Sequence, residues 1–250
     1  MWMMEKGKHL DGFVGAPVKL DGFTVATGSD STSMGIIFWK KVFVVRNSNV
    51  PGGKMGILLM DTQGLWDPDT PNDMNCCIFG ISCMLSSYLM INQKGVITSE
   101  LLTLLATLTK FSLSLNDRSS KIFQHMDLII RDHPDIDPNS ENLQDYIAVS
   151  QQQKQKTERS PAFSESIAQL KSCFQGYNVV CFPRPGNIDS NGYNGDISSI
   201  CPLFLRCVGH YIESVIRDLH PRMVGEVPLT GRTFREYDYV DMLIVDMLTS

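Results

Sequence analysis

The sequence has no Cys-x-x-Cys pair, although it contains seven cysteines. Their number is odd, Cys76 and Cys77 are adjacent, and the five histidines are scattered along the chain. Disulfide scaffolds and structural zinc sites both depend on regular cysteine and histidine spacings, so the sequence argues against both. The cysteines are therefore expected to be reduced, buried thiols of a protein that resides in a reducing, cytoplasmic compartment.

The chain also lacks an excess of positive charge and a long apolar run. Its 22 basic residues are outnumbered by 27 acidic ones, for a net charge of −5. Nucleic-acid binding needs a concentrated basic face, so no nucleic-acid partner is expected. The longest nearly apolar run, residues 76–91, is shorter than the ~20 residues that a spanning helix needs. The first residues lack the apolar core of a signal peptide, and no membrane segment is predicted.

What is present is an ordinary globular composition, with 250 residues of which 43% are hydrophobic and 20% charged. This length fits one large domain over residues 1–250. Dense β-branched and apolar stretches predict strands at residues 36–46, 54–61, 126–130 and 178–182. Apolar periodicity and caps predict helices at residues 70–91, 98–115, 163–174, 202–219 and 233–248. This order favours an α/β fold with a mostly parallel sheet and one antiparallel hairpin edge.

Polar residues lie at three places beside the predicted strands. Ligands of parallel α/β folds bind beyond the carboxyl ends of the strands. Asp61 ends an apolar strand, where it can hold magnesium through water, and Gly64 lets its backbone N–H approach a terminal phosphate. Arg131-Asp132 ends another strand, where a carboxylate can accept two hydrogen bonds from guanine. Ser33 lies in a polar loop and offers a hydroxyl to magnesium. Each feature alone also fits a turn, an ion pair or a polar loop.

In this order the features resemble the G domain of the atlastin and guanylate-binding-protein branch of the dynamin superfamily, and atlastins most. The resemblance runs from about Leu20 to the C-terminus. It rests on LLMDTQG and on two later segments, Ser172-Cys173-Phe174 and Pro183-Arg184-Pro185-Gly186. It implies a three-layer P-loop GTPase-like fold, GTP or GDP and Mg²⁺ as ligands, and a homodimer across the nucleotide face. It also implies a location at the cytosolic face of the endoplasmic reticulum.

The resemblance assigns a role to each polar residue at the strand ends. Asp61 and Gly64 match the switch II motif that senses magnesium and the γ-phosphate. Ser33 stands where the family has a magnesium-ligating threonine, so Ser33 and Gly64 are the expected catalytic residues, and Ser33 and Asp61 the expected metal-binding ones. Arg131 and Asp132 match the motif that binds guanine, and the segment 183–186 matches the loop that covers the base.

The resemblance departs at residues 1–20, which are an atypical remnant of the phosphate-binding-loop region. Such a loop reads Gly-x-x-x-x-Gly-Lys-Ser/Thr after a strand. Only Gly7 and Lys8 match it as nucleotide-binding residues, because Trp2 takes the place of the leading glycine and His9 that of the hydroxyl residue. Glu5 stands where the family's catalytic arginine is expected. The first strand of the fold is therefore expected to be missing.

Three interpretations remain open at this point. The first is GTP binding with weak hydrolysis by a G domain of this type. The second is a catalytically inactive relative that serves as a protein interaction module, and the third an incomplete fragment of a longer membrane-remodelling GTPase. Each charge-assisted hydrogen bond lost from the phosphate cradle costs ~1.5–3 kcal/mol. Two or three such losses amount to about three to five decades of affinity.

Overall fold

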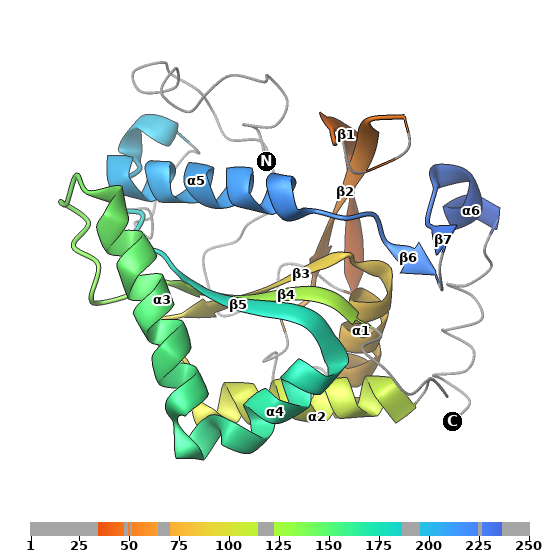
Figure 1. Ribbon diagram of the computed structural model, residues 1–250, viewed down its shortest axis with the longest axis horizontal. Helices are drawn as coiled ribbons and strands as arrows, with labels where there is room; N and C mark the ends of the chain where they lie inside the picture. Colours follow the sequence, from red (N-terminus) through yellow and green to blue (C-terminus); the bar gives the residue numbers. More distant parts are fainter. Residues whose placement is uncertain are drawn as a thin grey trace.

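The computed structural model of the chain describes residues 35–47, 50, 52–64, 71–114, 123–186, 196–224 and 227–236. At its centre lies a parallel sheet of three strands in the order β3 (Tyr88–Lys94), β4 (Phe123–Arg131) and β5 (Phe174–Cys181) (Figure 1). All three run in the same direction, so their carboxyl ends lie at one edge of the sheet. The predicted α/β class with a parallel sheet is confirmed.

Helices cover both faces of this sheet (Figure 1). One face carries α5 (Pro202–Asp218), and the other carries α1 (Asn72–Leu85), α2 (Ser99–Ser114) and α4 (Ser164–Cys173). Helix α3 (Leu143–Arg159) runs beside β5, and the short elements β6 (Met223–Val224), β7 (Val227–Pro228) and α6 (Gly231–Glu236) follow α5. The sheet and its helices thus form three layers around one core.

The predicted β-hairpin is confirmed, with β1 (Ile36–Arg46) antiparallel to β2 (Lys54–Thr62). Its turn uses Gly52 at φ 83° and Gly53 at φ 65°, a left-handed conformation that favours glycine. The sequence predicts that the hairpin forms one edge of the parallel sheet, which is wrong, because β1 and β2 form a separate sheet. Strand β2 buries Met55 but leaves Leu58 42% exposed, so its apolar run does not reflect burial on both faces.

Strand β3 falls where the sequence predicts the end of a helix reaching residue 91. Helix α1 instead ends at Leu85, and the Ser86 N–H donates to the Ser82 carbonyl at 3.0 Å. The apolar run is continuous across this boundary, so periodicity alone does not locate it. The helix also begins at Asn72, with Pro71 at the N-cap, whereas the predicted Thr70 cap lies outside the described residues.

The core encloses thiols and phenols whose pKa values are raised. Burial raises the pKa of Cys181 and of Cys207 to about 12. Burial, followed by the nearby Asp127 carboxylate, also raises the pKa of Tyr88 and of Tyr211. In an unfolded chain thiols and phenols ionise near ~8.5 and ~10. The folded state keeps these groups protonated above those values, so their contribution to stability is complete below about pH 8.5 and is lost above it.

We therefore expect the free energy of unfolding to decrease as the pH is raised from 8 to 10.5. Urea denaturation followed by circular dichroism at fixed ionic strength measures it. A variant with Cys181→Ala and Cys207→Ala should lose part of the decrease between pH 8 and 9.5, where thiols ionise first. An unfolding free energy that is as large at pH 10.5 as at pH 8 would contradict the expectation.

Candidate functional site

The turn after β4 has an unusual backbone. Asp132 has a φ of 58°, a left-handed conformation found at no other non-glycine residue of the described part. Aspartate tolerates this conformation better than most residues. The Gly95 N–H donates to the Arg131 carbonyl at 2.8 Å, and the His133 N–H donates to the Phe182 carbonyl at 2.9 Å. The turn is therefore held from the ends of both neighbouring strands.

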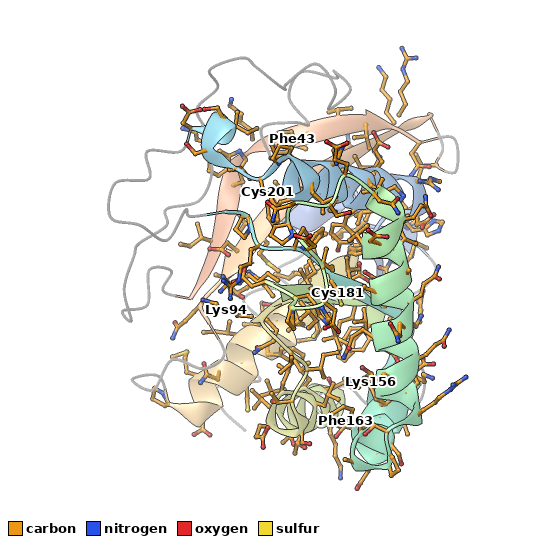
Figure 2. The ribbon with its side chains drawn as sticks, turned by 90° about the vertical axis from the view of Figure 1, so that its left-hand side faces the viewer. Phe43, Lys94, Lys156, Phe163, Cys181 and Cys201 are labelled. Atoms are coloured by element: carbon orange, nitrogen blue, oxygen red, sulfur yellow. The ribbon has the colours of Figure 1, made fainter. Side chains whose placement is uncertain are left out.

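The Asp132 carboxylate lies beside a cation from the neighbouring strand. Lys94 ends β3, and its Nζ lies 3.8 Å from Asp132 Oδ2. The Asp132 side chain is 12% exposed and the Lys94 side chain 62% exposed. Figure 2 looks at the side of the molecule where the parallel strands end and shows Lys94 there. The edge thus carries a largely enclosed carboxylate with an accessible ammonium next to it.

The segment 183–186 is fixed between β4 and α5. Just before it, the Phe182 N–H donates to the Ile130 carbonyl at 2.8 Å, and within it the Pro185 carbonyl accepts from the Cys201 N–H at 2.8 Å. Gly186 has a φ of 108°, and a Cβ there would lie 3.3 Å from the Ser199 carbonyl oxygen. Both the backbone angle and the close approach therefore call for glycine at this position.

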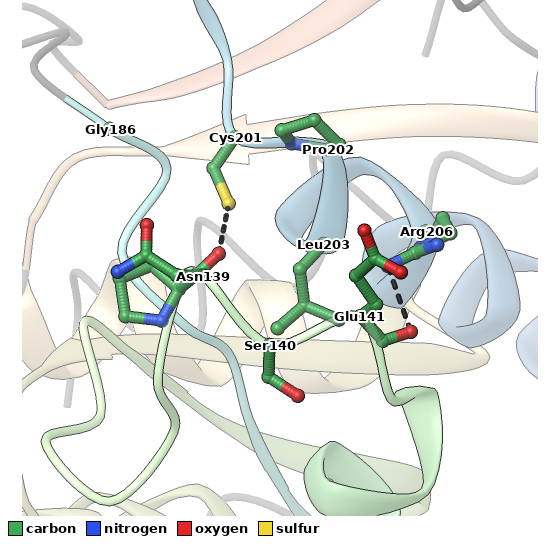
Figure 3. Close-up of a pocket in the computed structure, with 9 residues that line it drawn as sticks. Asn139, Ser140, Glu141, Gly186, Cys201, Pro202, Leu203 and Arg206 are labelled. Carbon is green, nitrogen blue, oxygen red and sulfur yellow. Dashed lines mark hydrogen bonds between the residues drawn. The ribbon is translucent and has the colours of Figure 1, made fainter.

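A cavity of about 450 Å³ opens between the loops that follow β4 and β5 and the start of α5 (Figure 3). Two hydrogen bonds join its walls, from Cys201 Sγ to the Pro138 carbonyl at 3.0 Å and from Arg206 Nη2 to the Glu141 carbonyl at 3.0 Å. The lining residues come from those two loops and from α5, and they are Pro138, Asn139, Ser140, Glu141, Gly186, Cys201, Pro202, Leu203 and Arg206. The cavity thus adjoins the segment 183–186, while Asp132 lies outside its lining.

The Asp61 motif is held against the start of the hairpin. Asp61 pairs with Ile37 in the register of β1 and β2. Two residues further on, the Gln63 N–H donates to the Gly35 carbonyl at 2.9 Å, and the Gly35 N–H donates to Gln63 Oε1 at 3.1 Å. Gln63 is 7% exposed. The structure therefore brings the segment after Asp61 to Gly35, two residues beyond Ser33 in the sequence.

The predicted site residues are only partly covered by the described ranges. Gly7, Lys8 and Ser33, and with them the whole remnant of residues 1–20, lie outside the described residues. Gly64 is exposed, and a Cβ there would meet no atom within 4 Å, so packing does not require a glycine. Asp61 is the last residue but one of β2, which belongs to the separate hairpin sheet, so a nucleotide site that Asp61 shares with Asp132 stays a prediction.

Sequence reasoning missed Lys94 and Gly95 as neighbours of Asp132. The prediction of a helix up to residue 91 places no strand end before them and so gives them no role. The signal that could have found them is the polar stretch Asn92-Gln93-Lys94 followed by glycine, which is typical of a strand end and turn. Their contact with Asp132 depends on the parallel register of β3 and β4, which pairs Lys94 with Arg131.

A layered α/β sheet with hydrogen-bonded polar turns beyond its strand ends is typical of α/β domains that bind ligands at the carboxyl edge of the sheet. The comparison with protein families agrees and is more specific. Residues 3–192, more than half of the chain, match the family described as guanylate-binding protein, N-terminal domain. The chain therefore belongs to this family and carries a G domain of its type, as the resemblance in the sequence predicts.

Curated relatives of the chain are atlastins. Atlastin-3 of Homo sapiens is 31% identical over 217 residues, which cover 85% of this chain and 39% of that protein. Atlastin of Drosophila melanogaster is 28% identical over 212 residues, covering 82% and 37%. Atlastin-1 of Rattus norvegicus is 25% identical over 197 residues, covering 75% and 34%. The chain thus spans less than half the length of these relatives. In its described part, no helix combines the length and apolarity needed to cross a bilayer.

Proposed function

We propose that the chain binds guanine nucleotides through one G domain over residues 1–250 and hydrolyses GTP weakly. The observation that carries this proposal is the Asp132 turn. Its carboxylate is 12% exposed at the carboxyl edge of the parallel sheet, and backbone hydrogen bonds hold the turn from both sides. A fixed carboxylate can accept from the ring N–H and the exocyclic amine of guanine together, a pairing that adenine does not offer.

The phosphates and the metal ion are assigned to the remaining predicted residues. Gly7 and Lys8 would contact the phosphates, Asp61 and Ser33 would hold Mg²⁺, and the Gly64 N–H would approach the γ-phosphate. The described residues contain no cluster of three or more potential metal-ligating side chains. Magnesium fits such a place, because it commonly takes one or two protein oxygens together with water and substrate phosphates. The ion would neutralise charge on the phosphates, and Asp61 would orient it.

The partners and the location are proposed from the same resemblance. A homodimer across the nucleotide face and a position at the cytosolic face of the endoplasmic reticulum belong to the proposal. All seven cysteines are free in the structure, which supports a reducing, cytoplasmic environment.

The second candidate function is an inactive G domain that serves as an interaction module, and the hairpin supports it. Val42 is 59% exposed and Val44 68% exposed, beside Leu58 at 42%. Val42 pairs directly with Leu58, so these side chains share one face of the hairpin. Apolar side chains gathered on an exposed face are typical of surfaces that contact another protein. Absence of nucleotide binding by the purified chain would favour this alternative.

Asp132→Asn tests the proposed function. The amide replaces one acceptor by a donor that meets the donors of guanine, so GDP binding should weaken by ~2–3 kcal/mol while ADP binding stays unchanged. Isothermal titration with Mg·GDP and Mg·ADP measures both affinities. Asp137→Asn is the matched control, because Asp137 lies exposed on the same loop, where its carboxylate accepts from the backbone N–H and the side-chain amide of Asn139. Equal affinity of the unmodified chain for GDP and ADP would contradict the proposal.

A further inference from the structure

The end of β3 lies next to Asp132, the proposed guanine-binding carboxylate. Lys94 pairs with Arg131 in the parallel register, so it lies next to the turn that Asp132 occupies. Gly95, at φ 85°, donates its N–H to the Arg131 carbonyl and fixes the end of β3 to that turn. The position of the Lys94 Cα relative to Asp132 is therefore set by the backbone of two strands.

The ammonium of Lys94 is close to the Asp132 carboxylate but does not form a hydrogen bond with it. Its Nζ lies 3.8 Å from Asp132 Oδ2, which is longer than a hydrogen bond. The Lys94 side chain is 62% exposed, so its stem can adjust and its three N–H donors remain available. An ion pair of this length contributes little to stability when its cation is exposed to solvent, as Lys94 is. The Lys94 ammonium is therefore better suited to bind a ligand than to stabilise the fold.

Guanine presents an acceptor and two donors in sequence along one edge. The carbonyl O6 is next to the ring N1–H, and the exocyclic N2 amine is next to that. When the Asp132 carboxylate accepts from N1–H and N2, O6 lies beside the carboxylate and needs a donor. Adenine places an amine where guanine has O6, and that amine has no acceptor in an ammonium group.

We propose that Lys94 donates a hydrogen bond to O6 of the bound guanine, so that Lys94 and Asp132 together read the acceptor and both donors of the base. This inference rests on the proposed function, because it concerns the same base site. It adds a specificity residue that comes from β3. The ammonium contributes affinity only when the base carries an oxygen at position 6.

The experiment measures GDP, IDP and ADP binding to the unmodified chain and to Lys94→Met by isothermal titration with Mg²⁺. IDP keeps O6 and N1–H but lacks the N2 amine. Loss of one charge-assisted hydrogen bond at an accessible site should weaken GDP and IDP binding about tenfold, which corresponds to ~1.4 kcal/mol, and leave ADP binding unchanged. Lys94→Arg should retain most of the affinity for GDP, because it keeps the donor and the charge.

Lys171→Met is the matched control, since Lys171 on α4 is also half-exposed but pairs with Glu158 of α3 at 3.0 Å. Equal weakening of GDP and ADP by Lys94→Met would overturn the inference, because it would indicate general attraction of phosphates. Unchanged or tighter GDP binding would overturn it as well. If Asp132→Asn removes a guanine preference that Lys94→Met leaves intact, the proposed function stands and only this inference fails. Equal binding of GDP and ADP by the unmodified chain would contradict both the proposed function and this inference.

Discussion

Single-turnover hydrolysis of Mg·GTP by this chain is expected to be at least two to three decades slower than by an atlastin-like G domain with a complete phosphate-binding loop. Phosphoryl transfer spreads negative charge over the γ-phosphate, and an arginine supplied to it contributes ~10³–10⁵ in rate. The sequence has no arginine before Arg46. Arg46 ends β1 next to the hairpin turn, where it pairs with Lys54. The first cation able to replace the missing group is therefore a lysine.

Lys6 and Lys8 replace only part of that contribution. Lysine is a point charge and lacks the planar fork with which arginine binds two phosphate oxygens at once. His9 stands where a serine or threonine would ligate magnesium, and its nitrogen is a poor ligand for a hard ion that prefers oxygen. Both deficits act on the transition state as well as on nucleotide affinity, so turnover should suffer more than binding.

The measurement is release of inorganic phosphate from Mg·GTP with enzyme in excess. A variant with Glu5→Arg and His9→Ser restores the missing functional groups and should hydrolyse GTP faster than a matched Glu5→Ala and His9→Ala variant. Hydrolysis by the unmodified chain near ~1 s⁻¹, the lower end of ordinary enzyme turnover, would show that other residues supply the missing charge. No gain from the restored groups would place the defect outside residues 5–9.

The parts of the fold that the sequence predicts well are those fixed by local chemistry. The hairpin follows from a β-branched strand and two glycines that the turn requires, and β1 is found at its predicted bounds. Helix α2 follows from its periodicity and from Thr98, whose hydroxyl accepts from the Leu101 N–H at 3.2 Å. Strand β4 follows from its dense apolar residues. Each of these signals is contained in a few neighbouring residues.

The parts that the sequence does not predict depend on distant contacts. Strand β3 is masked by an apolar run that continues from α1, and its identity is decided by pairing with β4. Membership of β2 in a sheet of its own is likewise a tertiary property. The position of Asp132 at a strand end follows from local residues and is predictable. The proximity of Lys94 to Asp132 depends on the pairing of β3 with β4 and is not predictable. Asp127 lies within the predicted strand 126–130, but its hydrogen-bond partners come from β3, β4 and α5 and cannot be located from the sequence.

Asp127→Ala is expected to lower the free energy of unfolding by ~3–5 kcal/mol. The Asp127 carboxylate is 1% exposed. Its Oδ2 accepts hydrogen bonds from the Tyr88 and Tyr211 hydroxyls at 2.8 Å each, and His125 Nε2 lies 2.9 Å from its Oδ1. Tyr88 belongs to β3, Tyr211 to α5 and His125 to β4. The Asp127 carboxylate therefore links two neighbouring strands of the sheet to the helix that covers them. Removing it leaves two phenols without their acceptor in the core.

Urea denaturation followed by circular dichroism measures this loss. A change of 1 kcal/mol shifts the melting temperature of a chain of this size by roughly 2–4 °C, so a fall of about 6–20 °C is expected. Asp135→Ala is the control, because Asp135 is exposed on the loop after β4. A loss below about 1 kcal/mol for Asp127→Ala would show that the network contributes little.

A triple variant separates the cost of unsatisfied groups from the loss of the carboxylate itself. Tyr88→Phe and Tyr211→Phe, added to Asp127→Ala, remove the two hydroxyls that the alanine leaves without an acceptor. Replacing all partners of a buried polar contact is far less costly than removing one of them. The triple variant should therefore be more stable than Asp127→Ala alone, even though it has lost more polar atoms. Additive destabilisation by the three changes would instead show that each hydroxyl has a second, independent partner.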